Sequence, residues 1–124
     1  MHKKLYFWAV LIWSGIISFF CLVQLNDVPL ASVSNIDKYV HAFFHFVLTF
    51  LCFLVLNNET NIKGNWKPLI YSFLFSLLFG IGIEIAQGLF TITRQSDLFD
   101  VLANIVGTAS AIVLISIYRL LKRK

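Results

Sequence analysis

Hydrophobic residues gather into four long runs, which short polar stretches separate along the chain. The helices predicted from these runs cover approximately residues 5–23, 34–56, 68–90 and 97–118. Each is close to the ~20 residues that an α-helix needs to cross a hydrocarbon layer about 30 Å thick. The pattern predicts an all-α polytopic membrane protein, with four transmembrane helices in a compact bundle and residues 1–124 forming a single domain.

Composition strengthens this prediction. The chain is 59% hydrophobic and 13% charged, whereas a soluble domain averages about 45–50% apolar and about 25% charged residues. A soluble fold of 124 residues has too small an interior for so many apolar side chains, so the lipid bilayer is the expected partner. No small-residue cleavage site follows the first run, which favours an uncleaved anchor helix over a signal peptide. Cys21 and Cys52 have no metal-type spacing and are expected to be unpaired.

The charged residues are distributed asymmetrically between the two ends of the predicted spans. Eight of the ten basic residues fall in the two tails and the second loop: Lys3, Lys4, Lys63, Lys67, Arg119, Lys122, Arg123 and Lys124. The positive-inside rule therefore predicts that both termini are cytoplasmic. The net charge of +4 is explained by this topology, and no nucleic-acid partner is expected. Of the six acidic residues, only Glu59 is assigned to the cytoplasmic side.

Each of the last three predicted helices carries one polar stripe. Residues spaced by three or four positions share a face of a helix. The stripes contain Asp37, Lys38, His41 and His45 in the second helix, Ser72, Ser76, Gly80, Glu84 and Gln87 in the third, and Asp97, Asp100, Asn104, Gly107 and Ala111 in the fourth. Gly80, Gly107 and Ala111 are candidates for close helix packing. We expect the stripes to meet in one pocket open to the outer surface, with Arg94 and Lys38 at its rim.

Structural roles are alternatives for most of these residues. Asp37, Asp97 and Asp100 can cap their helices, and Lys38 and Arg94 can neutralise neighbouring carboxylates. Either histidine can be a hydrogen-bonded core residue. Glu84 is not a cap, because it lies several residues inside its span, where an ionisable group costs at least ~2–3 kcal/mol unless it is paired or hydrated. Two explanations of Glu84 therefore remain: a structural salt bridge, or a role in a functional pocket.

The ordered pattern of these residues resembles the VanZ-like family of small bacterial membrane proteins. The pattern is Asp37-Lys38-x-x-His41, then Glu84-x-x-Gln87, then Arg94-x-x-Asp97-x-x-Asp100-x-x-x-Asn104-x-x-Gly107. It departs from the family at Ala42, where phenylalanine is usual, and at Ala111, where glycine is frequent. His45-Phe46 supplies the histidine-phenylalanine pair one turn later, so which of the two histidines matters stays open.

The resemblance implies a multi-pass protein of the bacterial cytoplasmic membrane with an envelope-associated role, and glycopeptide (teicoplanin) tolerance is a candidate for that role. The residues themselves make a lipid headgroup or a cell-wall precursor the candidate ligand, because Lys38, Arg94 and the N-termini of the second and fourth helices could hold a phosphate. The resemblance implies no established reaction, ligand or oligomeric state.

Two other classes of function are open. An intramembrane enzyme acting on a lipid-linked substrate could use the histidines and carboxylates as acid, base or metal ligands. The spacing of His41 and His45 can place two imidazoles on one ion, but no complete metal motif or activated nucleophile is visible. We therefore expect no metal and no cofactor, and a non-catalytic role is favoured. A small transporter ranks last, because the first helix contains no acidic residue.

Overall fold

The computed structural model describes residues 2–22, 36–60, 66–90 and 98–122, and this part of the chain forms four α-helices. They are α1 (His2–Leu22), α2 (Ile36–Thr60), α3 (Lys67–Phe90) and α4 (Leu98–Lys122). Every helix contains a segment that is long and apolar enough to cross a membrane. The predicted all-α fold with four membrane-spanning helices is confirmed.

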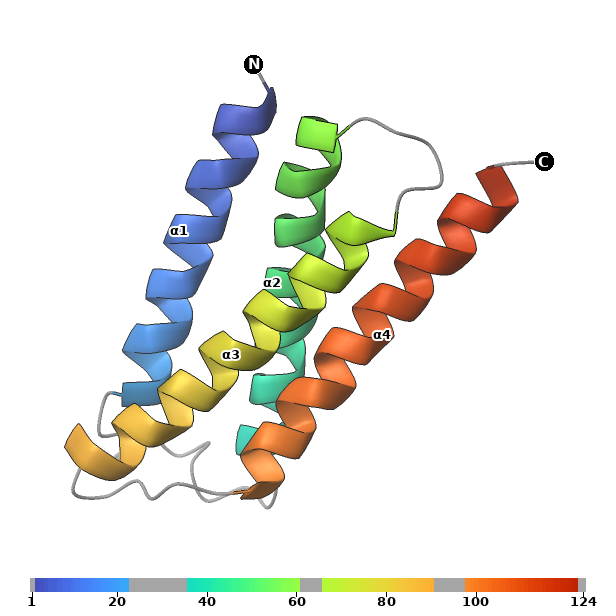
Figure 1. The fold of residues 1–124 in the computed structure, drawn as a ribbon. Coiled ribbons are helices and arrows are strands. Elements are labelled where there is room, and N and C mark those ends of the chain that lie inside the picture. The colour runs from blue at the N-terminus through green and yellow to red at the C-terminus, as the bar shows by residue number, and fades with distance from the viewer. Residues whose placement is uncertain (1, 23–35, 61–65, 91–97, 123–124) are drawn as a thin grey trace.

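The four helices run alternately up and down, so the two ends of the chain lie at the same end of the bundle (Figure 1). We call the opposite end, where α2 and α4 begin, the polar end. α2 packs most extensively against α4, although the whole of α3 separates them in sequence. Within the described residues α1 contacts α2 and α3 but has no substantial contact with α4. The polar end is therefore built mainly by α2, α3 and α4.

Two helices extend beyond the ends predicted from hydropathy. α2 continues to Thr60 and α4 to Lys122, past the predicted ends at residues 56 and 118. Hydropathy marks only the part of a helix in hydrocarbon, whereas backbone hydrogen bonding continues into the interface. Arg119 and Lys122 lie in the last turn of α4, where positive charge interacts favourably with the helix dipole. The predicted starts at residues 34 and 97 lie outside the described residues.

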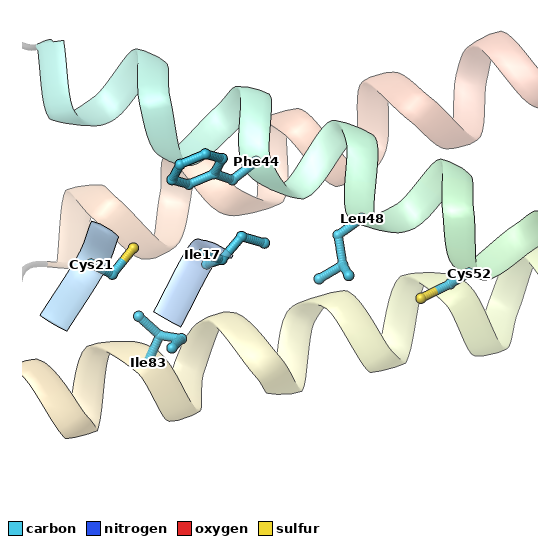
Figure 2. Packing of buried hydrophobic residues seen from close by; sticks show 6 residues of the cluster. All are labelled: Ile17, Cys21, Phe44, Leu48, Cys52 and Ile83. Atoms are coloured by element: carbon cyan, nitrogen blue, oxygen red, sulfur yellow. The ribbon is translucent and has the colours of Figure 1, made fainter. Parts of the chain in front are cut away.

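An apolar cluster fixes α1 to its neighbours. Figure 2 shows side chains of α1, α2 and α3 turned into the space between these helices; they are Ile17, Cys21, Phe44, Leu48, Cys52 and Ile83. Both cysteines are buried, and they form no disulfide bond with each other. Trp13 adds a polar contact, because its indole Nε1 donates a hydrogen bond of 2.9 Å to the backbone carbonyl of Phe44.

The outer surface of the bundle is strongly apolar. Large hydrophobic side chains on every helix are exposed, among them Phe19, Phe43, Leu78, Leu89 and Val106. In water such a surface would be unstable, whereas lipid tails cover it without penalty. The distribution fits contact with a bilayer and a multi-pass membrane protein.

Candidate functional site

The interior of the bundle is unusually polar. The buried polar and charged residues are His41, His45 and Thr49 of α2, Ser72, Ser76, Glu84 and Gln87 of α3, and Asp100, Asn104 and Thr108 of α4. Within each set the residues are three, four or eight positions apart, so each set occupies the inward face of its helix. Polar side chains thus share the interior with the apolar cluster, while the surface that faces lipid is apolar.

The residues nearest the polar end form what we call the ionisable cluster: Lys38, His41, Glu84, Asp100 and Asn104. Lys38 Nζ lies 2.9 Å from Asp100 Oδ1. His41 Nε2 lies 3.6 Å from Asp100 Oδ2, and His41 Nδ1 lies 3.9 Å from Glu84 Oε1. His41 Nδ1 is also within 3.1 Å of Asn104 Oδ1. The three helices thus meet around one imidazole.

The charges of this cluster are deeply buried. His41, Glu84 and Asp100 are 2%, 4% and 5% exposed. Only Lys38 reaches toward the surface, with a side chain 27% exposed. Two carboxylates face a single lysine, so within these residues the cluster has one excess negative charge when His41 is neutral. A buried charge inside a membrane span is expensive unless it is compensated, and a proton on His41 or a bound cation would each reduce the negative charge of these residues.

A second polar group lies deeper in the bundle and links the same three helices. His45 Nδ1 is 2.8 Å from Ser76 Oγ, and Ser76 Oγ is 2.8 Å from Thr108 Oγ1. Thr49 donates a hydrogen bond of 2.7 Å to the carbonyl of His45, one turn back on its own helix. These contacts join neutral groups, so they satisfy hydrogen bonding without introducing charge.

Two glycines allow the helices to approach closely enough for these contacts. A Cβ atom at Gly107 would overlap the backbone carbonyl of Ala42, so α4 lies directly against the backbone of α2. A Cβ atom at Gly80 would lie 2.7 Å from Asn104 Nδ2 and 2.9 Å from His45 Cε1. Ala111 continues the same buried face of α4. Small residues at helix interfaces act in this way throughout membrane proteins.

Some hydrogen-bonding capacity inside the bundle is unused. His45 Nε2 and Asn104 Nδ2 are buried and have no hydrogen-bond partner among the described residues. Both side chains border Gly80. Buried polar atoms without partners are uncommon in proteins and are frequent at sites that bind water, ions or ligands.

The structure brings together five of the residues predicted for the site: Lys38, His41, Glu84, Asp100 and Asn104. His45 lies one turn deeper, with Ser76. Gln87 lies elsewhere, because its Nε2 donates a hydrogen bond of 2.6 Å to the carbonyl of Cys21 and so joins α3 to α1. Asp37 belongs to α2, but its side chain is outside what the structure describes, as are Arg94 and Asp97 altogether.

Thr108 and Thr49 were not predicted as parts of the polar interior. A signal for both exists in the sequence, because Thr108 follows Asn104 by four residues and Thr49 follows His45 by four. Threonine is common in transmembrane helices, where its hydroxyl can bond the backbone of its own helix. The spacing alone therefore did not distinguish Thr108, which bonds across to another helix, from Thr49, which does not.

Three side chains of the ionisable cluster are arranged as a metal site would require. His41, Glu84 and Asp100 each offer one ligand atom, and these atoms lie within 4.8 Å of one another. His45 is not part of this group; its Nδ1 contacts Ser76 instead. This ligand set combines one imidazole with two carboxylates, whereas the sequence spacing allowed the two imidazoles of His41 and His45 to share one ion.

A separate groove of about 270 Å³ lies between α3 and α4, away from these residues. It is lined by Trp66, Leu69, Ile70, Phe73, Leu74, Ile112 and Ser116. Its walls are almost entirely apolar and carry no ionisable group, so the groove offers no chemistry of its own.

Fold and site together define a class: a polytopic α-helical membrane protein that keeps an ionisable cluster inside one end of its bundle. Comparisons with protein-family models, with curated proteins and with solved structures gave no match. The resemblance to the VanZ-like family therefore stays a prediction from the sequence pattern.

Proposed function

We propose that this chain is a VanZ-like protein of the bacterial cytoplasmic membrane, which binds the polar headgroup of an envelope lipid or a lipid-linked cell-wall precursor in its ionisable cluster. Both termini are cytoplasmic in this proposal, so the polar end faces the outer surface. A contribution to glycopeptide tolerance is the phenotype that the family resemblance suggests.

The observation that carries the proposal is that three buried ionisable residues, His41, Glu84 and Asp100, meet around one point with the partly exposed Lys38 beside them. A bundle that only needed to be stable would gain from apolar side chains here, because replacing buried ion pairs with packed hydrophobic residues is often neutral or stabilising. Ionisable groups inside membrane spans mark ligand sites and ion pathways more often than structural ones. The ionisable cluster lies near one end of the bundle, about 8–9 Å along α2 and α3 from their polar ends. This depth suits a lipid headgroup better than a solute that crosses the membrane.

The test is drug susceptibility of a deletion strain complemented with wild type, Glu84→Gln or Lys122→Gln, with the amount of membrane-inserted protein measured in each strain. Glu84→Gln keeps the shape of the side chain and removes its charge. Lys122→Gln is the matched control, because it neutralises an exposed charge at the other end of α4. We expect rescue by wild type and Lys122→Gln only. Equal rescue by Glu84→Gln would reject a functional role for the cluster.

An enzyme acting on a lipid-linked substrate is the second candidate. It is favoured by the distances of 3.6 and 3.9 Å that join His41 to the two carboxylates, because this arrangement can transfer a proton or hold an ion. The test is turnover of a radiolabelled lipid-linked precursor by the purified protein. Turnover by wild type that is abolished in His41→Gln would show that the function is catalysis and not binding alone. Transport ranks third, because the first helix contains no acidic residue.

A further inference from the structure

We propose that His41, Glu84 and Asp100 bind one divalent metal ion of the zinc type, and that this ion holds an anionic oxygen of the bound ligand. The inference rests on the proposed function, because it specifies how the same cluster recognises a headgroup. It differs from the sequence analysis, which expected no metal because no ligand motif was visible along the chain.

The hydrogen bond to Asn104 determines which nitrogen of His41 can coordinate. Asn104 Oδ1 is an acceptor, so His41 Nδ1 carries the proton and donates to it over 3.1 Å. In the neutral imidazole Nε2 then has a lone pair, and it faces Asp100 Oδ2 at 3.6 Å. Two electron-rich atoms at this separation repel each other unless a positive charge lies between them. Ligand atoms about 2.0–2.2 Å from a tetrahedral ion lie roughly 3.4 Å apart, close to the observed distance.

The other atoms of these ligands are already held in place. Asn104 fixes the ring of His41 through Nδ1, and Lys38 Nζ lies 2.9 Å from Asp100 Oδ1, leaving Oδ2 toward the imidazole. Metal sites depend on such partners, which orient the coordinating atoms and set the tautomer of the histidine. Glu84 completes the set from α3, because one ligand atom of each of the three residues lies within 4.8 Å of the others, and Glu84 Oε1 is 3.9 Å from Nδ1 of the same imidazole.

The ion would change the sign of the cluster. Two carboxylates and Lys38 give a net charge of about −1 with neutral His41, which repels a phosphate group; a divalent ion raises this to about +1. Three protein ligands leave a tetrahedral ion one open position, as in zinc sites that bind water or substrate. The same acidic residues that would otherwise exclude an anion thus become the means of binding one.

The ligand types select the class of metal. Calcium and magnesium prefer sites made of oxygen atoms alone, whereas imidazole nitrogen favours zinc and neighbouring transition metals. Cys21 and Cys52 belong to the apolar cluster and not to the group of candidate ligands. We therefore expect nitrogen and oxygen, without sulfur, around the ion.

The experiment uses the full chain in detergent, stripped with chelator, dialysed and titrated with Zn²⁺ by calorimetry, with bound metal measured by mass spectrometry. The variants are Glu84→Gln and Asp100→Asn, and His45→Gln is the matched control because it removes an imidazole one turn away. We expect one ion per chain in wild type and His45→Gln, with at least tenfold weaker binding in both carboxylate variants. Equal affinity in all four proteins would mean an adventitious ion only, and no binding by wild type would overturn the proposal.

X-ray absorption of the Zn²⁺-loaded wild type tests the site without relying on the folding of variants. One imidazole with oxygen neighbours is expected, and sulfur neighbours would overturn the assignment.

A third measurement separates this inference from the proposed function. It compares the binding of phosphatidylglycerol in nanodiscs with the binding of free phosphate, each with and without chelator. Glu84-dependent lipid binding that survives the chelator would reject the metal and keep the function. The opposite result is Zn²⁺ binding at the three ligands, no headgroup binding, and full rescue by Glu84→Gln. That result would keep the metal site and reject the proposed function.

Discussion

Replacing Gly107 by alanine provides the sharpest test of how closely α2 and α4 approach. The added methyl group would overlap the carbonyl oxygen of Ala42 and lie 2.7 Å from its carbonyl carbon and 2.9 Å from its Cα. All three are backbone atoms, so no side-chain rotation can relieve the overlap. Bringing the carbonyl carbon to the ~3.5 Å at which carbon atoms attract requires a separation of about 0.8 Å, and the overlap with the oxygen is tighter still, so the helices must separate by at least this amount.

The expected loss has two parts. Overpacking a tight interface costs about 1–3 kcal/mol. Separation also lengthens the bond from His41 Nδ1 to Asn104 Oδ1 from 3.1 Å to about 3.9 Å, beyond hydrogen-bonding distance, and a buried polar pair left unbonded costs about 1–3 kcal/mol. A total of about 3 kcal/mol lowers the folded-to-unfolded ratio more than 100-fold.

The assay is equilibrium unfolding in mixed micelles with an increasing fraction of denaturing detergent, followed by circular dichroism. Gly82→Ala is the matched control, because nothing lies within 4 Å of the methyl group that it adds and its position is exposed. Alanine is the better helix former, so the control should match or exceed wild type. A Gly107→Ala protein within about 0.5 kcal/mol of wild type would refute the close approach of the two backbones.

Two further substitutions test contacts away from the ionisable cluster. Gln87→Leu removes the 2.6 Å hydrogen bond to the carbonyl of Cys21 and should lower stability by about 1 kcal/mol. Amide hydrogen exchange should become faster in α1 and stay unchanged in the core of α2–α4. An equal increase in exchange in all four helices would contradict this prediction. Arg119→Gln removes a guanidinium that lies 5.8 Å and 5.4 Å from the ring centres of Phe53 and Trp66. It should lower stability by about 1 kcal/mol in the same micelle assay, whereas Arg119→Lys should retain part of the cation–π stabilisation. Equal stability of wild type and both variants would argue against the cation–π contact.

The fold was predictable from the sequence because lipid imposes a simple requirement. A membrane span must satisfy its backbone hydrogen bonds internally and present apolar side chains over about 20 residues, and both demands are visible in composition and run length. The inward faces were also visible, because polar residues such as Ser72, Ser76 and Asn104 recur at helical intervals. Local sequence carries this information without reference to any other helix.

The pairing within the site could not be predicted in the same way. Glu84 and Gln87 are three residues apart and were assigned to one stripe, yet Glu84 faces His41 of α2 whereas Gln87 bonds the carbonyl of Cys21 in α1. Three residues turn a helix by about 300°, so the two side chains diverge by about 60°. In a four-helix bundle that angle is enough to change the neighbour. The rotation of each helix and its shift along its axis depend on packing against the others, which a single stripe does not encode.

The long-range packing of α2 on α4 has a consequence for how the protein is made. Helices enter the membrane in chain order, so Lys38 and His41 are inserted well before Asp100 and Asn104, which emerge last. Until α4 docks, the charged side chains of α2 have none of their partners on that helix, and the half-made bundle must hold them near water or in a protein-lined channel. Docking of α4 therefore does more than bury apolar surface, because it brings Asp100 to Lys38 and Asn104 to His41.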